Sequence, residues 1–370
     1  GVPIVVGGGV RASARPTSRS LLSLDDTGLT ALRDRSLDAS QSGNVSVRVP
    51  GLTAEVVPPD TTRVDRVEVT IATALRRLSA GDIDGAARAI AESPNDSDPE
   101  LIALRSITEF ASLNFDAAAA DATLAQRLDP DIPLVSNLAT VVLFKIDILS
   151  GLPREALSRA EWGIARNPES TYLRLMRSEA LLELRRFDDA RTELTAVLRL
   201  DPTSPLALAR LGMLEVSEGW FTTGRRLIGR AASMSGALAQ DGPEIKVARA
   251  LGEAAAAFYG NAARQFSEAG RLAEEVLNDP ACDPRSAVRA LTVLAGSAAF
   301  QADWALAERH VNRARELAPG SPEVLTAVGQ IAHQAKRDDI ARKYLNEVRV
   351  TAPDHPAVIA LVEALKNGGK

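Results

Sequence analysis

Residues 185–202 read RRFDDARTELTAVLRLDP, and this stretch decides the fold. A turn that contains Phe187 leads into a run whose apolar residues return every three or four positions, the period of a helix with one buried face. The run holds a small residue, Ala190, and stops at Pro202, which has no amide hydrogen to continue a helix. The stretch therefore predicts one amphipathic helix with a small residue at a crossing point and a defined end.

The same two markers recur along the chain at one period. Ala156, Ala190 and Gly224 are evenly spaced, and the interval from Ala307 to Ala341 is the same. A proline follows twelve residues after the small residue in five places: Pro130, Pro168, Pro202, Pro319 and Pro353. Two independent markers with one period predict paired helices repeated along the chain.

This pattern resembles the tetratricopeptide repeat family, whose unit of about 34 residues has small residues at set places and a proline near its end. Ser178, Gly212 and Gly329 match the small places of the first helix, and Phe115, Phe187, Phe221 and Trp304 match the aromatic residue that plugs the turn. The resemblance implies an all-α fold, a right-handed superhelical solenoid of helix pairs.

Three regions are expected. Residues 1–63 form a largely irregular N-terminal extension with a predicted β-hairpin at 44–57, where apolar and polar residues alternate around Pro50-Gly51. Residues 64–355 form about eight helix pairs, irregular at 236–285, because the interval from Gly224 to Ala307 is longer than two repeats. Residues 356–370 form a helix that caps the last apolar face.

Charge and composition narrow the class of partner. The net charge is −5, so the chain lacks the overall positive field that binding to nucleic acid requires, and we expect no nucleic-acid partner. The preference for Arg over Lys indicates a GC-rich, bacterial genome. One cysteine and three scattered histidines predict no disulfide and no metal site.

The sequence contains no apolar run of the roughly 18 residues that a membrane helix needs. Membrane association is therefore expected only through a partner or a removed leader. The start at Gly1 in place of Met favours such processing. We accordingly expect the periplasm or cell envelope in preference to the cytoplasm.

No catalytic motif is found: the chain has no Walker loop, no nucleophile elbow and no His-Glu-x-x-His. We expect no enzyme activity and no cofactor. The resemblance instead implies that a peptide or helix of a partner protein binds in the concave groove lined by the first helix of each pair. The residues at the groove places of the family are Thr108, Lys145, Glu179, Met213 and Gln330, with Tyr172, Leu175, Thr326 and His333 nearby.

The leading hypothesis is a non-catalytic scaffold or adaptor that binds partner proteins in a multiprotein assembly, with the bacterial cell envelope as the preferred setting. One alternative is a structural subunit that forms an oligomer through its N-terminal extension. Another is the repeat region of a larger regulatory or catalytic protein.

Overall fold

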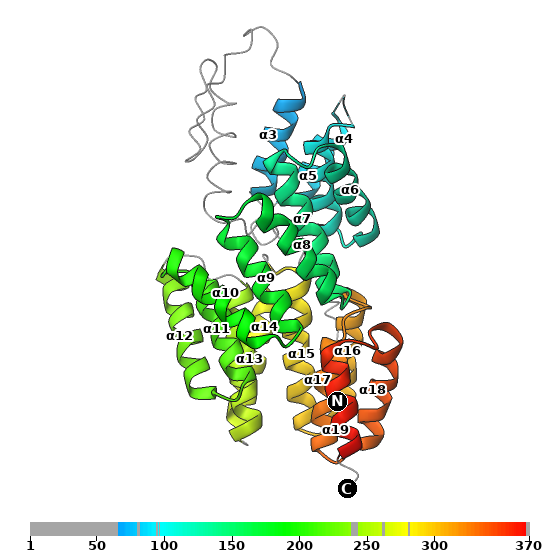
Figure 1. Cartoon of the computed structure of the whole chain (residues 1–370). Helices are drawn as coiled ribbons and strands as arrows, with labels where there is room; N and C mark the ends of the chain where they lie inside the picture. Colours follow the sequence, from blue (N-terminus) through cyan, green and yellow to red (C-terminus); the bar gives the residue numbers. More distant parts are fainter. Residues whose placement is uncertain are drawn as a thin grey trace, which may run out of the picture.

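The computed structural model describes residues 66–79, 82–93, 95, 97–237, 243–260, 263–279 and 282–367. Within these ranges every regular element is an α-helix, so the expected all-α solenoid is confirmed (Figure 1). The predicted hairpin at 44–57 and the rest of the extension 1–63 lie outside the described residues. The helices, in chain order, are α3 (Arg66–Ser79), α4 (Ile83–Ala91), α5 (Pro99–Ala111), α6 (Phe115–Leu128), α7 (Pro133–Leu149), α8 (Pro153–Arg166), α9 (Thr171–Glu183), α10 (Phe187–Leu200), α11 (Pro205–Ser217), α12 (Phe221–Ala237), α13 (Pro243–Gly260), α14 (Ala263–Leu277), α15 (Pro284–Phe300), α16 (Trp304–Leu317), α17 (Glu323–Gln334), α18 (Asp338–Thr351) and α19 (Pro356–Asn367).

The helices form antiparallel pairs, and six of the described turns within these pairs are of one kind. In each of the six, the second residue after the first helix has positive φ, and this left-handed residue ends the helix. Glycine takes this conformation readily, but it stands there only at Gly151 and Gly219. The other four positions are Leu113, Arg185, Ala302 and Lys336. The repeat therefore fixes the turn even where the residue type disfavours it.

The small residues found by their spacing lie at the crossings between helices. Ala118, Ala156, Ala190, Ala307 and Ala341 are all 0% exposed. Each first helix also packs against the first helix of a neighbouring pair, as α5 does on α7 and α15 does on α17. Small side chains at the crossings let the helices approach closely, and this packing propagates into a solenoid.

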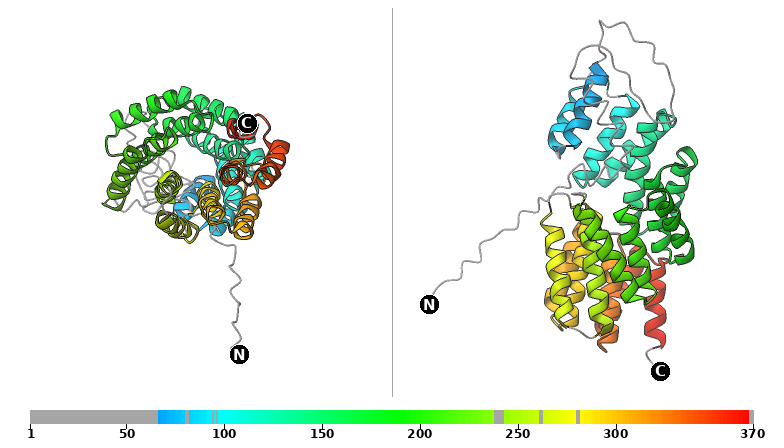
Figure 2. Two further views of the ribbon diagram at one scale, coloured as in Figure 1. Left: turned by 90° about the horizontal axis from the view of Figure 1, so that it is seen from below. Right: turned by 90° about the vertical axis from the view of Figure 1, so that its left-hand side faces the viewer.

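The solenoid curves until its C-terminal part returns beside its middle (Figure 2). The return is a direct contact: a Cβ added to Gly320 would lie 3.1 Å from the carbonyl oxygen of Ser150. Val288 and Ala318 also belong to the same buried apolar cluster as Leu149. Helices α15–α19 therefore stand against the α7–α9 region although they come much later in the sequence.

The irregular unit and the C-terminal region both contain well-defined helices. The unit between Gly224 and Ala307 contains α13 and α14, of 18 and 15 residues. The last helix, α19, packs against α17 and α18 and buries Val358 and Leu361 completely. Among the described residues, none of the helices has the length and apolar character needed to cross a membrane.

Candidate functional site

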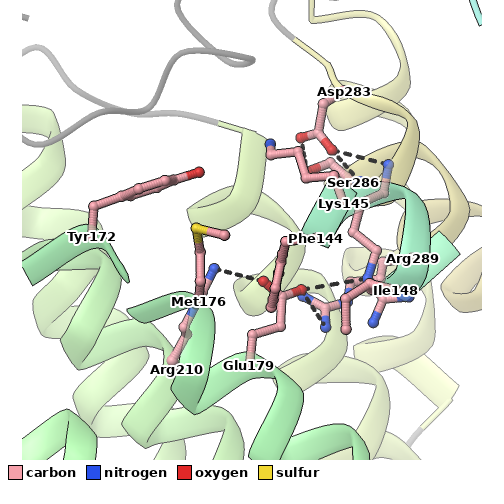
Figure 3. A pocket seen from close by; sticks show the side chains of 11 residues that line it. Phe144, Lys145, Ile148, Tyr172, Met176, Glu179, Arg210, Asp283, Ser286 and Arg289 are labelled. Atoms are coloured by element: carbon pink, nitrogen blue, oxygen red, sulfur yellow. Dashed lines mark hydrogen bonds and ion pairs between the residues drawn. The ribbon is translucent and has the colours of Figure 1, made fainter. Parts of the chain in front are cut away.

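A cluster of ion pairs lies where α9, α11, α15 and α17 meet, and Figure 3 shows the part of it around Glu179. We call it the central cluster. Its members are three glutamates and three arginines: Glu179, Glu183, Glu323, Arg210, Arg285 and Arg289.

Local sequence places these side chains on matching faces. Glu179 and Glu183 are four residues apart on α9, and Arg285 and Arg289 are four residues apart on α15, so each pair lies on one face of its helix. Asp283 accepts hydrogen bonds from the amides of Arg285 and Ser286 at 2.9 and 3.2 Å and fixes the start of α15. The helix start therefore sets where Arg285 enters the cluster.

Glu179 is the centre of the cluster. Its Oε2 accepts a hydrogen bond of 3.0 Å from Arg210 Nη2, while Arg289 Nη2 and Arg285 Nε lie 3.4 and 3.5 Å from Oε1. In Figure 3, Arg210 and Arg289 reach this carboxylate from opposite sides. Arg210 also donates to the carbonyl oxygen of Leu175, which ties α11 to α9.

Glu183 and Glu323 complete the cluster on the side of α17. Arg285 forms an ion pair with Glu183 and donates to Glu323 Oε2 at 2.6 Å, and Arg289 Nη2 lies 3.3 Å from Glu183 Oε1. His355, just before α19, brings its Nε2 to 3.9 Å from Glu183 Oε2.

The pKa shifts follow from burial and from these pairs. Burial acts to raise the pKa of Glu179, but Arg210, Arg289 and Arg285 overcome it and hold the pKa at about 2. The pKa of Glu183 is likewise lowered by Arg285 and Arg289 against the effect of burial. Burial prevails at Glu323 and raises its pKa, and burial lowers the pKa of His355. Two of the glutamates are therefore firmly ionised, and the third is held less well in its charged form.

Two cavities adjoin the central cluster. The first has a volume of about 20 Å³ and lies between Phe144, Lys145, Tyr172, Met176 and the cluster, with room for about one water molecule. The second, which we call the side cavity, has a volume of about 340 Å³. Its apolar wall is formed by Leu182, Phe187, Met213, Val216, Leu251 and Ala255, and its charged wall by Glu183, Arg185, Arg289, Glu323 and His355.

Four of the residues predicted for the groove lie at these cavities. Lys145, Tyr172 and Glu179 line the first cavity, and Met213 lines the side cavity.

Three other predicted groove residues are buried between packed helices. Leu175 is 6% exposed in an apolar cluster. Thr108 and Thr326 are 2% and 3% exposed, and their hydroxyls donate to the carbonyl oxygens of Arg105 and Pro322.

The last two predicted groove residues, Gln330 and His333, lie on α17. His333 Nδ1 is 2.7 Å from Asp338 Oδ1, and Gln330 is half-buried. The structure therefore brings together the predicted groove residues of α7, α9 and α11, and separates them from those of α5 and α17.

Sequence reasoning missed Glu183, Arg210, Arg285, Arg289, Glu323 and His355. The spacing of four between like charges on α9 and on α15 was the signal present in the sequence. Among the described residues, no group of His, Cys, Asp and Glu side chains has the arrangement of a metal site.

Comparison with known proteins agrees with this architecture. A family model described as tetratricopeptide repeat matches residues 150–205 and 292–356, which include α9–α10 and α16–α17. Residues 150–205 and 292–356 therefore contain tetratricopeptide repeats. No curated protein matches it significantly.

Solved structures resemble the chain in fold. A human IFIT1 dimer with m7Gppp-AAAA is 14% identical, covers 94% of this chain and 89% of its own, and has a TM-score of 0.55. A human IFIT1 dimer with PPP-AAAA is 13% identical, covers 96% and 88%, and has a TM-score of 0.54. A tetratricopeptide repeat protein from Parabacteroides merdae ATCC 43184 is 15% identical, covers 74% and 100%, and has a TM-score of 0.40. At these identities the likeness to the two IFIT1 structures shows the fold alone.

Proposed function

We propose that the chain is a non-catalytic scaffold that holds a partner protein within a multiprotein assembly, and that the partner binds at the side cavity. Tetratricopeptide repeats generally mediate interactions between proteins. The observation that carries the proposal is the side cavity itself, with its volume of about 340 Å³ and its lining of both apolar and charged side chains. Binding pockets combine an apolar lining with a few polar groups in this way.

The size of the cavity defines how a partner would bind. A volume of about 340 Å³ takes one or two side chains and not a whole helix. We therefore expect the partner to insert a bulky apolar residue against Met213, Val216 and Leu251, while the rest of its segment lies along the rim. Anchor residues of this kind contribute most of the binding energy in many protein interfaces.

The two IFIT1 structures contain m7Gppp-AAAA and PPP-AAAA. Phosphate binding requires cationic side chains that are not neutralised by neighbours. In this chain the three arginines of the central cluster are matched by three glutamates. This balance of charge favours a protein partner over RNA.

Two serines allow a matched test. Ser217 lines the side cavity, while Ser233 lies on α12 away from the lining, and both are exposed and donate to the carbonyl oxygen four residues earlier. A photo-crosslinking amino acid at position 217, introduced in the native host, should capture a discrete partner that position 233 does not. The Ser217→Arg substitution, which fills the cavity mouth, should weaken binding of that partner at least about tenfold, or roughly 1.4 kcal/mol. Ser233→Arg should leave binding unchanged. Equal yields at the two positions, or equal binding by the two arginine variants, would contradict the proposal.

The setting of the assembly is a separate proposal. We infer a bacterial cell-envelope assembly, and fractionation of the native host that finds the protein only in the cytoplasm would exclude it. Self-assembly through residues 1–63 is tested by sedimentation of the full chain and of a chain without those residues. A smaller number of subunits in the assembly after the deletion supports self-assembly, and an equal number rejects it.

A further inference from the structure

The central cluster joins parts of the chain that local packing does not join. Glu183 ends α9 and Arg285 lies in the first turn of α15, 102 residues later. A partly buried pair nearby is local: Arg177 and Glu193, 2.6 Å apart, link α9 to α10, its partner in the same helix pair. The pairs made by Arg285 and Arg289 therefore connect two distant parts of the solenoid.

A backbone contact closes the same junction. Gly320, in the loop before α17, would place a Cβ 3.1 Å from the carbonyl oxygen and 3.2 Å from the Cα of Ser150. The space between the two loops is tight for an added methyl group, so the Ser150 backbone would have to shift to accommodate it. Separation of α15–α19 from α7–α9 would thus break the ion pairs and this contact together, and it would expose Val288 and Ala318, which belong to the same buried apolar cluster as Leu149.

The arginines of α15 cover a predicted groove residue of α9. Glu179 is at a groove place of the family, and Arg285 and Arg289 both approach it (Figure 3). The cavity left beside them has a volume of about 20 Å³, which excludes a partner side chain. A bound basic segment of another protein would neutralise the same carboxylates in the same way.

We propose that Arg285 and Arg289 act as an internal ligand for Glu179 and Glu183, and that this contact is a latch that holds the solenoid closed. When the latch opens, α15–α19 move away from α9 and the two carboxylates become available to an arginine- or lysine-bearing segment of a partner. The second statement rests on the proposed function, whereas the first does not.

The energetics of buried ion pairs favour a latch that can open. Desolvation of buried charges offsets much of their attraction, so a buried ion pair holds two elements in register with little net stability. The charged wall of the side cavity also keeps contact with solvent, since about a fifth of the Glu183 and Glu323 side chains is exposed. Water can therefore enter the junction from this side.

The distance between α12 and α18, which lie on opposite sides of the molecule in Figure 1, would report opening. Spin labels at Arg226→Cys and Arg342→Cys occupy exposed positions. The native Cys282 is 4% exposed, and burial together with Asp283 and Asp279 raises the pKa of its thiol, so it remains unlabelled.

The latch variant combines Glu183→Gln with Arg285→Met, which leaves the net charge unchanged. Pulsed electron paramagnetic resonance should show the mean label distance lengthened by more than about 2 Å and a broader distribution, with the helical circular dichroism retained. The control combines Glu193→Gln with Arg177→Met, which removes a local pair of the same kind, and its distances should match those of the parent.

A second variant opens the junction without a change of charge. Gly320→Ala presses on the Ser150 backbone and should lengthen the same distance, and it decides the matter if the latch variant does not fold. The proposal is overturned if folded latch and Gly320→Ala proteins keep the parent distance, or if the control lengthens equally. Because this measurement needs no partner, its failure is distinct from a failure of crosslinking at Ser217.

Discussion

Gly224 marks the crossing of α11 and α12, and a methyl group there has no space. A Cβ at Gly224 would lie 2.6 Å from the carbonyl oxygen of Gly212, 2.6 Å from Val216 Cγ2 and 3.0 Å from the Val216 amide nitrogen. Two of these three atoms belong to the backbone, so the helices themselves must separate. Overpacking of this kind typically costs about 1–3 kcal/mol.

A matched control lies one and a half turns further along the same helix. Gly229 is exposed, and a Cβ there would meet no atom within 4 Å. Replacement of either glycine by alanine gains about 1 kcal/mol of helix propensity. Because this gain cancels, the difference in unfolding free energy between Gly224→Ala and Gly229→Ala isolates the clash, and we expect roughly 1–3 kcal/mol.

Urea unfolding followed by far-ultraviolet circular dichroism measures the difference. Since repeat proteins can unfold in parts, hydrogen exchange of the α11 and α12 amides should accompany it. We expect faster exchange in Gly224→Ala and a stability equal to or above that of the parent in Gly229→Ala. If the two variants are equally stable, α11 and α12 do not cross at Gly224 and the assigned role of the repeated small residue is incorrect.

Three further outcomes are expected. Burial raises the pKa of Asp147 from 3.8 to about 6, despite the opposing effect of Arg159. Between these two pH values the folded state holds a proton that the unfolded state has released. The stability that this proton provides is therefore lost as the pH rises through about 6. Asp147→Asn should therefore stabilise the protein at pH 7.5 by roughly 1–3 kcal/mol and flatten its stability between pH 5 and 7.5, measured by urea titrations at each pH. Asp98→Ala should cost about 1 kcal/mol in the same assay, because Asp98 accepts two amide hydrogen bonds at the start of α5, whereas Asn114→Ala should cost less, because Asn114 makes no such bond. Cys282 should react with a thiol reagent only when urea unfolds its surroundings, since burial raises the pKa of the thiol; rapid reaction in buffer would contradict its place in the core.

The fold could be predicted from the sequence because its determinants are local. Ala190 and Pro202 act on helices that are neighbours in sequence, so their regular recurrence from one unit to the next carries the architecture directly. The turn at Arg185 adopts its left-handed conformation as part of this repeat. Contacts within one repeat length are therefore enough to predict the fold.

The site could be predicted only in part because its determinants are distant. The family register selected Glu179, Lys145 and Tyr172, which line the small cavity beside the central cluster. The partners of Glu179 on α15 depend on how far the solenoid curves, a sum of small rotations that the sequence does not state. The same register selected Thr108, whose hydroxyl instead bonds within its own helix at Arg105.

Because Arg285 and Arg289 already contact Glu179, opening of the latch would change the affinity for a partner protein. If the carboxylates of Glu179 and Glu183 bind a partner only in the open state, the apparent Kd equals the intrinsic Kd divided by the open fraction. A mutation that opens the junction without touching the carboxylates, such as Gly320→Ala, would then strengthen binding and create no new contact. Substitution at Ser217, by contrast, changes the contact itself and leaves the open fraction alone. Mutations at Gly320 therefore report on closure of the solenoid, and mutations at Ser217 report on the contact with the partner.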